Sequence, residues 1–227
     1  MYICTMHIWI IGDEARYEAL RQNLFKEDHC HFTTENYPSP DNKIDIVIDT
    51  LWDTDPNDRL MKLLDYTDCA IWLHAMNATL RSTLYSMNSN TDRAITSINA
   101  IPCYLSAPAL EMVFHNAQAK THTSEILSIL NKKIIEVPSQ VGMISPRIIG
   151  MIINEAYYTI QEGITSRADA DLSMRLGTNY PYGPFEWANK WGIKNIYQLL
   201  RALEKETGDP RYKPSALLRI EAENTMS

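Results

Sequence analysis

Two histidines in the N-terminal half have neighbours that could support proton transfer. Glu111 precedes His115 by four residues, and residues four apart face each other when the segment is helical. A histidine oriented by a carboxylate is a frequent general base. His74 follows the apolar run Cys69–Leu73, which would place it at the carboxyl end of a strand, where α/β proteins commonly form their sites. Both are candidates for acid–base chemistry, and the alternative is a surface or locally hydrogen-bonded histidine.

Metal binding has less support in the sequence. His29 and His31 have strand spacing, but no third ligand is evident, so no metal site is predicted. The four cysteines are widely separated and form no Cys-x-x-Cys pair; they are Cys4, Cys30, Cys69 and Cys103. Reduced, buried thiols are therefore expected rather than a disulfide framework or a zinc site.

Composition limits the class of protein. The chain has 227 residues, 45% of them hydrophobic, and a net charge of −7. This charge argues against a nucleic-acid partner and against an anionic membrane surface. No apolar run approaches the roughly 20 residues that span a bilayer, and no signal peptide is apparent. A cytoplasmic protein without a membrane partner is expected.

The elements that would position these residues alternate between strand and helix up to about residue 137. The predicted strands are His7–Ile11, His29–Thr34, Ile44–Ile48, Cys69–Leu73, one strand within Ala94–Leu105 and one before Val137. The predicted helices are Asp13–Phe25, Asp55–Leu64, Thr79–Met87, Ala109–Lys120 and one beginning near Ser124. Such alternation predicts an α/β fold with a Rossmann-like parallel sheet in a domain of residues 1–140.

The rest of the chain is predicted to be helical, in a domain of residues 141–227. Arg147–Gly163 has a long apolar face typical of a central buried helix. Ser166 can cap the next helix, which Gly177 would close. Pro184–Trp191 and Asn195–Thr207 are two further predicted helices.

A series of motifs in this second half resembles the 3-hydroxyacyl-CoA dehydrogenase family. The motifs stand in family order: Thr123-Ser124-Glu125, Arg147, Asn154-Glu155-Ala156, Glu162-Gly163, Asp169, Asp171, Met174, Gly177 and Tyr180–Glu186. The resemblance implies an all-α dimerisation domain that forms a homodimer and one side of an acyl-CoA cleft. An acyl-CoA-like ligand is therefore a possible partner.

The resemblance also implies an NAD site on a Gly-x-Gly-x-x-Gly turn, but the corresponding turn here is altered. Gly12 is followed by Asp13 and Glu14, so only the first glycine is present. The two carboxylates would stand where phosphates should lie and would use the free N–H groups of the helix themselves. Glu35 could hold the adenosine ribose, or it could be a solvated loop residue. NAD binding is expected to be weak or lost.

The catalytic positions implied by the resemblance are a histidine, a glutamate twelve residues later, and an asparagine beside the arginine of the long helix. Counting from Ala107-Pro108 places Tyr104 at the histidine, Asn116 at the glutamate and Pro146 at the asparagine. None of the three replacements can perform the family role, because tyrosine is a poor base near neutral pH and proline has no side-chain donor. His115 is the nearest histidine that could substitute.

Three functions are compatible with this pattern. The first is a catalytically degenerate family member that keeps the two-domain architecture and the dimer for ligand binding or association. The second is an active NAD-dependent 3-hydroxyacyl-CoA dehydrogenase that uses rearranged residues such as Tyr104 or His115. The third is a structural homodimer without a ligand, which neither NAD nor CoA compounds would protect from thermal unfolding.

Overall fold

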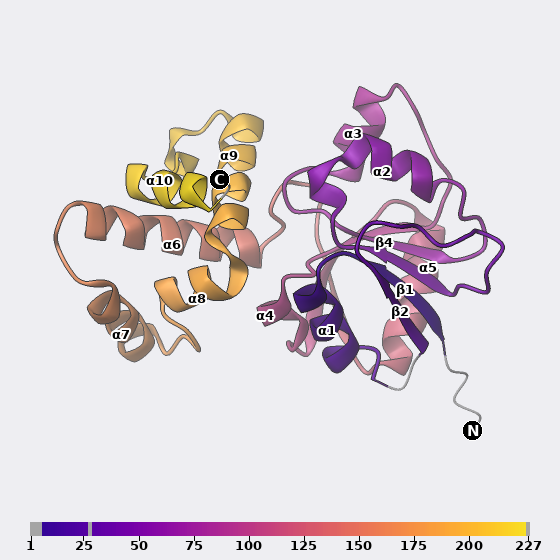
Figure 1. The fold of residues 1–227 in the computed structure, drawn as a ribbon, viewed down its shortest axis with the longest axis horizontal. Coiled ribbons are helices and arrows are strands. Elements are labelled where there is room, and N and C mark those ends of the chain that lie inside the picture. The colour runs from indigo at the N-terminus through magenta and orange to yellow at the C-terminus, as the bar shows by residue number, and fades with distance from the viewer. Residues whose placement is uncertain (1–5, 27–28, 226–227) are drawn as a thin grey trace. The chain divides into compact units, whose positions relative to one another are not determined.

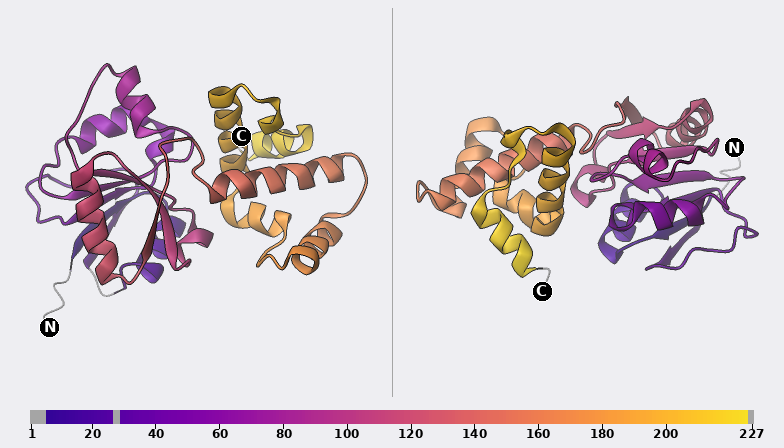
Figure 2. Two further views of the ribbon diagram at one scale, coloured as in Figure 1. Left: turned by 180° about the vertical axis from the view of Figure 1, so that it is seen from behind. Right: turned by 90° about the horizontal axis from the view of Figure 1, so that it is seen from above.

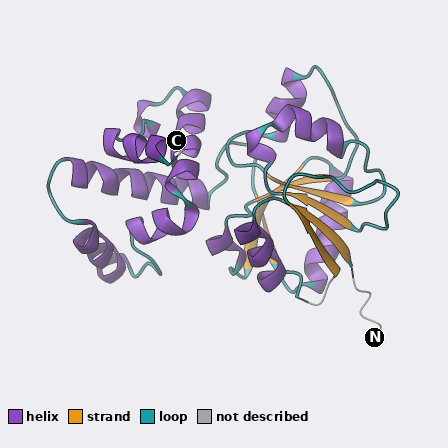
Figure 3. Ribbon diagram, viewed as in Figure 1, coloured by secondary structure: helices purple, strands orange, loops and turns teal. Residues whose placement is uncertain are grey.

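The computed structural model describes residues 6–26 and 29–225. The chain divides into two compact units between Gln140 and Val141. Within the described residues, strands occur only in the first unit, and the second unit is built from helices (Figure 3). None of the helices seen there combines the length and the apolar character that crossing a membrane requires.

The first unit contains a seven-stranded sheet in the order β2-β1-β3-β4-β5-β6-β7. The strands are β1 (His7–Ile11), β2 (His29–Thr33), β3 (Ile46–Asp49), β4 (Ala70–His74), β5 (Ile95–Ile98), β6 (Ala109–Phe114) and β7 (Lys133–Glu136). All neighbouring strands are parallel except β5 and β6, which are antiparallel. The order reverses at β1, since β2 lies on one side of it and β3 on the other. This reversal is the point at which α/β sheets bind ligands.

Helices cover both faces of this sheet (Figures 1 and 2). They are α1 (Glu14–Asn23), α2 (Pro56–Leu63), α3 (Leu80–Ser86), α4 (Pro102–Leu105) and α5 (Ala117–Ile129). Leu20 of α1 and Leu127 of α5 pack with Ile10 and Trp72 on one face. The helices α2 and α3 pack against the other face, where Val47 is buried. Strands β3 to β5 are buried along their whole length, as expected for strands covered on both sides.

The predicted α/β class is confirmed, but the helix predicted at Ala109–Lys120 is wrong. Residues Ala109–Phe114 form β6, and α5 begins only at Ala117. Short apolar runs fit a strand or a buried helix equally well, and here the antiparallel ladder with β5 decides. As a result the sheet is mixed rather than wholly parallel. The motif Thr123-Ser124-Glu125 lies inside α5 and does not start a helix.

The second unit consists of α6 (Ser145–Gln161), α7 (Arg167–Thr178), α8 (Pro184–Trp191), α9 (Ile193–Thr207) and α10 (Ala216–Asn224). As predicted, α6 is central and contacts α8, α9 and α10. Asn154 fixes the chain before α10, because its amide donates to the Lys213 carbonyl at 2.9 Å and accepts from the Ser215 N–H at 2.9 Å. A buried asparagine bonded at both ends in this way explains why the helix needs a polar residue in its apolar face.

The loop Tyr180–Glu186 holds α7 against α8. The Asp171 carboxylate accepts from the Phe185 N–H at 2.8 Å, and the Glu186 carboxylate accepts from the Gly183 N–H at 2.8 Å. Gly183 lies so close to α7 that an added Cβ would be 2.4 Å from the Asp171 Cα. The motif therefore specifies a close helix–loop contact.

Replacing Gly183 with alanine is expected to lower the free energy of unfolding by about 2 kcal/mol or more, because backbone atoms of α7 would have to move. Chemical denaturation followed by circular dichroism measures this loss. Gly177→Ala is the matched control: a Cβ there meets nothing within 4 Å, and alanine favours the helix. Equal stability of the two variants would contradict the assigned contact.

Candidate functional site

The carboxyl ends of β1, β3, β4 and β5 form the edge of the sheet at which a site is expected. Gly12 follows β1, Thr50 follows β3, His74 ends β4 and Asn99 follows β5. In the register of the two strands beside the switch point, Ile11 is opposite Asp49. Residues just beyond this pair therefore face the crevice that would receive a ligand.

Gly12 has no free space around it. Its N–H donates to the Thr33 carbonyl at 2.9 Å, so it is engaged within the sheet. A Cβ on Gly12 would lie 1.8 Å from the Thr50 hydroxyl oxygen. Thr50 in turn is bonded to the Ile11 carbonyl, at 3.0 Å from its hydroxyl. The glycine is therefore required for packing against β3, independently of any phosphate.

An ion pair from α1 lies across the same crevice. The Asp13 side chain caps the helix by accepting from the Arg16 N–H at 2.8 Å, and its other oxygen is 2.9 Å from Arg16 Nη1. The same guanidinium nitrogen donates to the Thr50 carbonyl at 3.1 Å. The helix N-terminus is thus capped by a carboxylate of the chain, and a cation of the chain joins α1 to the residue that follows β3. These are the groups and the place that a dinucleotide phosphate would otherwise use.

A buried polar network stands beside this pair. Asp49 has no exposed surface, and both of its carboxylate oxygens are 2.9 Å from Arg59 Nη1. The Tyr37 hydroxyl donates to Asp49 and lies 3.1 Å from the same guanidinium nitrogen. Burial, together with the Asp49 charge, raises the pKa of Tyr37 far above its usual range, so the hydroxyl remains a donor. The network ties the loop after β2 to β3 and α2.

Asp53 organises the segment after β4. Its carboxylate accepts the N–H groups of Met76, Asn77 and Ala78 at 2.8, 2.9 and 3.2 Å. Burial raises the pKa of Asp53 from its ordinary 3.8 to about 6, although the three N–H groups and Arg16 oppose the shift. Asp53 thus holds the backbone of the segment that follows β4 through three hydrogen bonds.

Asp53 is expected to titrate near pH 6 in the folded protein. Because the folded chain then holds this proton more tightly than the unfolded chain, the contribution of Asp53 to the free energy of unfolding is full below pH 3.8 and is lost as pH rises through about 6. Carboxyl-carbon NMR shifts recorded against pH measure the pKa, and Asp53→Asn assigns the signal. Titration near 3.8 would contradict the burial argument.

His74 is buried, and it serves the fold. Its Nδ1 accepts from the Ala100 N–H at 3.1 Å, which joins the end of β4 to the turn after β5. Burial, and secondarily the charge of Arg16, lowers the pKa of His74 well below its usual range. A neutral imidazole that already accepts a backbone hydrogen bond is a poor general base.

Within the sheet unit, the structure does not bring together Tyr104 and Asn116, two of the residues predicted as catalytic. Tyr104 lies in α4 before β6, and Asn116 follows β6, so the strand's six residues, about 20 Å of chain, separate them. Asn116 caps α5 by accepting from the Ala119 N–H at 2.8 Å, and it donates to the Arg93 carbonyl at 2.9 Å. Pro146 is buried in the first turn of α6, in the other unit.

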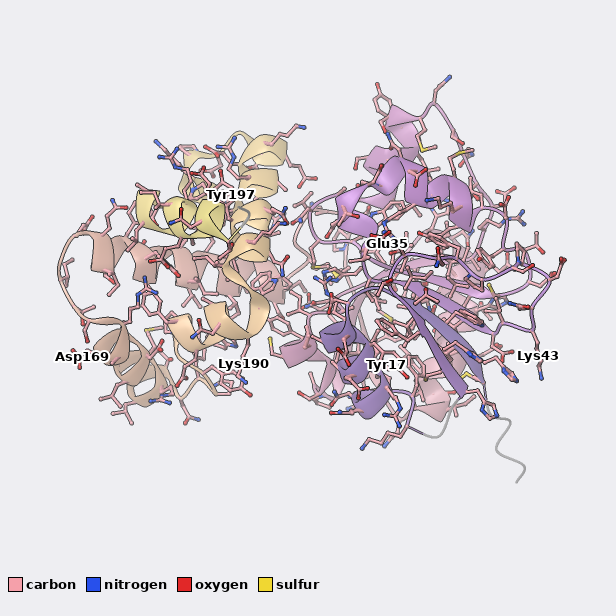
Figure 4. All side chains as sticks on the ribbon, viewed as in Figure 1. Tyr17, Glu35, Lys43, Asp169, Lys190 and Tyr197 are labelled. Carbon is pink, nitrogen blue, oxygen red and sulfur yellow. The ribbon has the colours of Figure 1, made fainter. Side chains whose placement is uncertain are left out.

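The expected pairing of His115 with Glu111 is wrong. Both belong to the β6 segment, where four residues span about 13 Å instead of one helical turn. His115 Nε2 is instead 2.9 Å from the Thr91 carbonyl. Glu35 is exposed in the loop after β2 (Figure 4). Tyr17 on α1 stacks on Phe32 with ring centroids 4.7 Å apart.

Comparison with known proteins assigns the helical unit. Residues 142–225 match the family model described as the 3-hydroxyacyl-CoA dehydrogenase C-terminal domain. The helical unit belongs to the 3-hydroxyacyl-CoA dehydrogenase family. The 3-hydroxyadipyl-CoA dehydrogenase of Escherichia coli is 43% identical over 91 residues, which cover 40% of this chain and 19% of that protein. A probable 3-hydroxybutyryl-CoA dehydrogenase of Bacillus subtilis is 34% identical over 90 residues, 40% of this chain and 31% of that protein.

The similarity of fold extends further than the similarity of sequence. The crystal structure of FadB2 from M. tuberculosis has a TM-score of 0.75 and covers 97% of this chain and 95% of that one, at 14% sequence identity. The sheet unit thus shares the architecture of that protein. The two sequence relatives match over less than a third of their own length.

The sheet register reveals a residue pair that counting from Ala107 missed. Ile98 of β5 is opposite Met112 of β6, and one further step along this antiparallel ladder places Asn99 opposite Glu111. Glu111 is also the twelfth residue after Asn99, which is the spacing that the family resemblance implies for its histidine and glutamate. Both residues are buried. The twelve-residue spacing between Asn99 and Glu111 is visible in the sequence, but their opposition follows only when Ala109–Phe114 is recognised as a strand.

Tyr104 is the one sequence-predicted residue with an unused reactive group. Its hydroxyl is buried without a hydrogen-bond partner among the described residues. Burial, with smaller effects of Cys103 and Glu111, raises the pKa of Tyr104 far above its usual range. The phenol can therefore donate a proton but cannot serve as a base near neutral pH.

Proposed function

We propose that this chain is a catalytically inactive member of the 3-hydroxyacyl-CoA dehydrogenase family that acts as a dimeric binding or association module. The observation that carries the proposal is the closed switch point: Arg16 is bonded to both Asp13 and the Thr50 carbonyl, where a dinucleotide phosphate would lie. NAD, the cofactor that the family resemblance implies, has no helix N-terminus left to bind there.

Asn99, which follows β5, and Glu111 of β6 support the same proposal. Counting the twelve-residue spacing back from Glu111 would give Asn99 the position of the catalytic histidine, and its side-chain oxygen accepts from the Ile101 N–H at 3.2 Å. An amide cannot take a proton from a hydroxyl group as hydride leaves. A retained Glu111 without its histidine would have no imidazolium to stabilise.

The helical unit supports the proposed homodimer. No residue of α7 is buried in the isolated chain. Leu172 and Leu176 of this helix are 47% and 79% exposed, and Ile164 just before it is 68% exposed. A separate apolar hollow of about 350 Å³ lies between α6, α7 and α8. Exposed apolar surface of this kind marks a protein interface, and a second copy is the occupant that the family resemblance suggests.

Reduction of acetoacetyl-CoA, followed by NADH absorbance, tests the inactive assignment. We expect no turnover by the unmodified protein or by Tyr104→Phe. The second candidate function is an active dehydrogenase that uses Tyr104, and the unpartnered phenol beside Glu111 favours it. Turnover that is lost in Tyr104→Phe would establish that function and overturn the proposal. An acyl-CoA-like compound that raises the melting temperature without turnover would support a binding role.

A further inference from the structure

The sheet unit contains a cavity that is separate from the switch point. Gly12, Arg16 and Asp53 are not among the residues that line it. It has a volume of about 410 Å³ and lies between α3 and strands β5 and β6. This size is within the range of roughly 300–1,000 Å³ found for small-molecule sites. The residues that determine its chemistry are Arg81, Leu84, Ile95, Ser97, Val113 and His115.

Ser97 places a hydroxyl group on the wall of the cavity. The residue is only 6% exposed, and its position in β5 puts its side chain on the same face of the sheet as Ile95. Both residues line the cavity. The Ser97 hydroxyl makes no hydrogen bond to another described residue, and it is not one of the unpaired side-chain atoms that are shielded from solvent. The hydroxyl is therefore available to a ligand that enters the cavity.

Arg81 gives the outer part of the cavity its charge. It is exposed on α3, and in the described part of the chain no carboxylate forms a salt bridge with it. Among the described residues, it is the one lysine, arginine, aspartate or glutamate in the lining of this cavity. His115 lies nearby with its Nε2 held at 2.9 Å from the Thr91 carbonyl. A single guanidinium suits a monoanion, and bidentate recognition of a carboxylate is its strongest mode.

Apolar side chains connect the two polar ends. Leu80, Leu84 and Ile95 belong to the buried cluster beneath α3, and Val113 lies opposite Ser97 in the strand pairing. A ligand that reaches from Arg81 to Ser97 must therefore pass an apolar wall. An anionic group outside, an apolar middle and a hydroxyl or carbonyl group inside would match these surroundings.

We propose that this cavity binds a small monocarboxylate that carries a hydroxyl or keto group at the far end of a short apolar chain. Arg81 would pair with the carboxylate, and Ser97 would bond to the inner oxygen. The site is separate from the closed crevice at Gly12, so it does not depend on whether the chain is an active dehydrogenase.

Binding of four probes to the full chain tests this proposal. The probes are 6-hydroxyhexanoate, hexanoate, hexane-1,6-diol and inorganic phosphate, each titrated to about 10 mM, as expected for weak binding. We expect 6-hydroxyhexanoate to bind most tightly and to shift the amide signals of β5 and α3 in two-dimensional NMR spectra. Ser97→Ala should weaken the binding of 6-hydroxyhexanoate about fivefold, because one hydrogen bond is lost. The binding of hexanoate should not change.

Arg81→Gln should weaken the binding of both carboxylates about fivefold or more. Arg21→Gln on α1 is the matched control and should change the binding of neither. The location of the NMR shifts in the unmodified protein decides the matter even where a variant fails to fold. Absence of binding by all four probes would overturn the proposal. Shifts that map elsewhere, or a preference for phosphate over both carboxylates, would also overturn it.

Discussion

Asp49→Ala is expected to lower the free energy of unfolding by about 3–5 kcal/mol, because it leaves a guanidinium without its buried partner. Asp49 is fully buried, and the Arg59 side chain is only 11% exposed. The substitution also removes the acceptor of the Tyr37 hydroxyl. Urea denaturation of the unmodified and variant proteins measures the loss.

A surface ion pair on α2, the helix that carries Arg59, serves as the control. Lys62 and Asp58 are 2.6 Å apart, but both side chains are at least half exposed, so Asp58→Ala should cost less than about 1 kcal/mol. In a double-mutant cycle with Arg59→Ala, the Asp49 and Arg59 substitutions should be strongly non-additive. A loss for Asp49→Ala no greater than that for Asp58→Ala would show that the network does not stabilise the edge of the sheet.

Leu176→Arg, combined with Leu172→Arg, is expected to convert the proposed dimer into a monomer. Each exposed leucine of α7 would become buried against the second copy, and a charge there would be desolvated without a partner. Light scattering after size exclusion should show the mass fall to the 26.0 kDa of one chain. The fold of each copy should be unchanged, because neither leucine is buried within it.

Ile129→Arg provides the matched control for this experiment. Ile129 is 68% exposed on α5, in the sheet unit, so its replacement should leave the dimer intact. If the unmodified protein is itself a monomer at micromolar concentration, or if Ile129→Arg dissociates the dimer equally well, the proposed interface is wrong.

Much of the fold could be predicted because local pattern and tertiary structure agree. In the helical unit, Ser166 caps α7 as expected, accepting from the Asp169 N–H, and Pro184 begins α8. The β1, β3 and β4 segments were recognisable because strands covered on both faces have continuous apolar sequences.

The predictions failed where a short apolar segment could adopt either structure. Ala109–Phe114 became a strand because β5 offered it a ladder, a long-range contact that local sequence does not contain. The same error hid the register of β5 and β6, in which one step beyond Ile98 and Met112 brings Asn99 opposite Glu111. The sequence also could not place Arg59 beside Asp49, because ten residues and a turn separate them.

The structure adds an interaction at the altered turn after Gly12 that the sequence did not predict. Asp13 and Glu14 were expected to repel phosphates, whereas the more important residue is Arg16, which was not singled out. A cation three residues after the cap pairs with it and reaches the Thr50 carbonyl. The proposed loss of NAD binding therefore rests on the bonds of Arg16 as well as on the charges of Asp13 and Glu14.

Direct titration of NADH tests the central claim, that the chain's own side chains close the cofactor site. Binding of NADH to a protein usually changes its fluorescence, and the change can be followed to about 1 mM, a binding free energy of about −4 kcal/mol. We expect no saturable change, and none in the presence of acetoacetyl-CoA. A saturable change with a Kd in the micromolar range would contradict the account, because it would require Arg16 to leave Thr50 and Asp13.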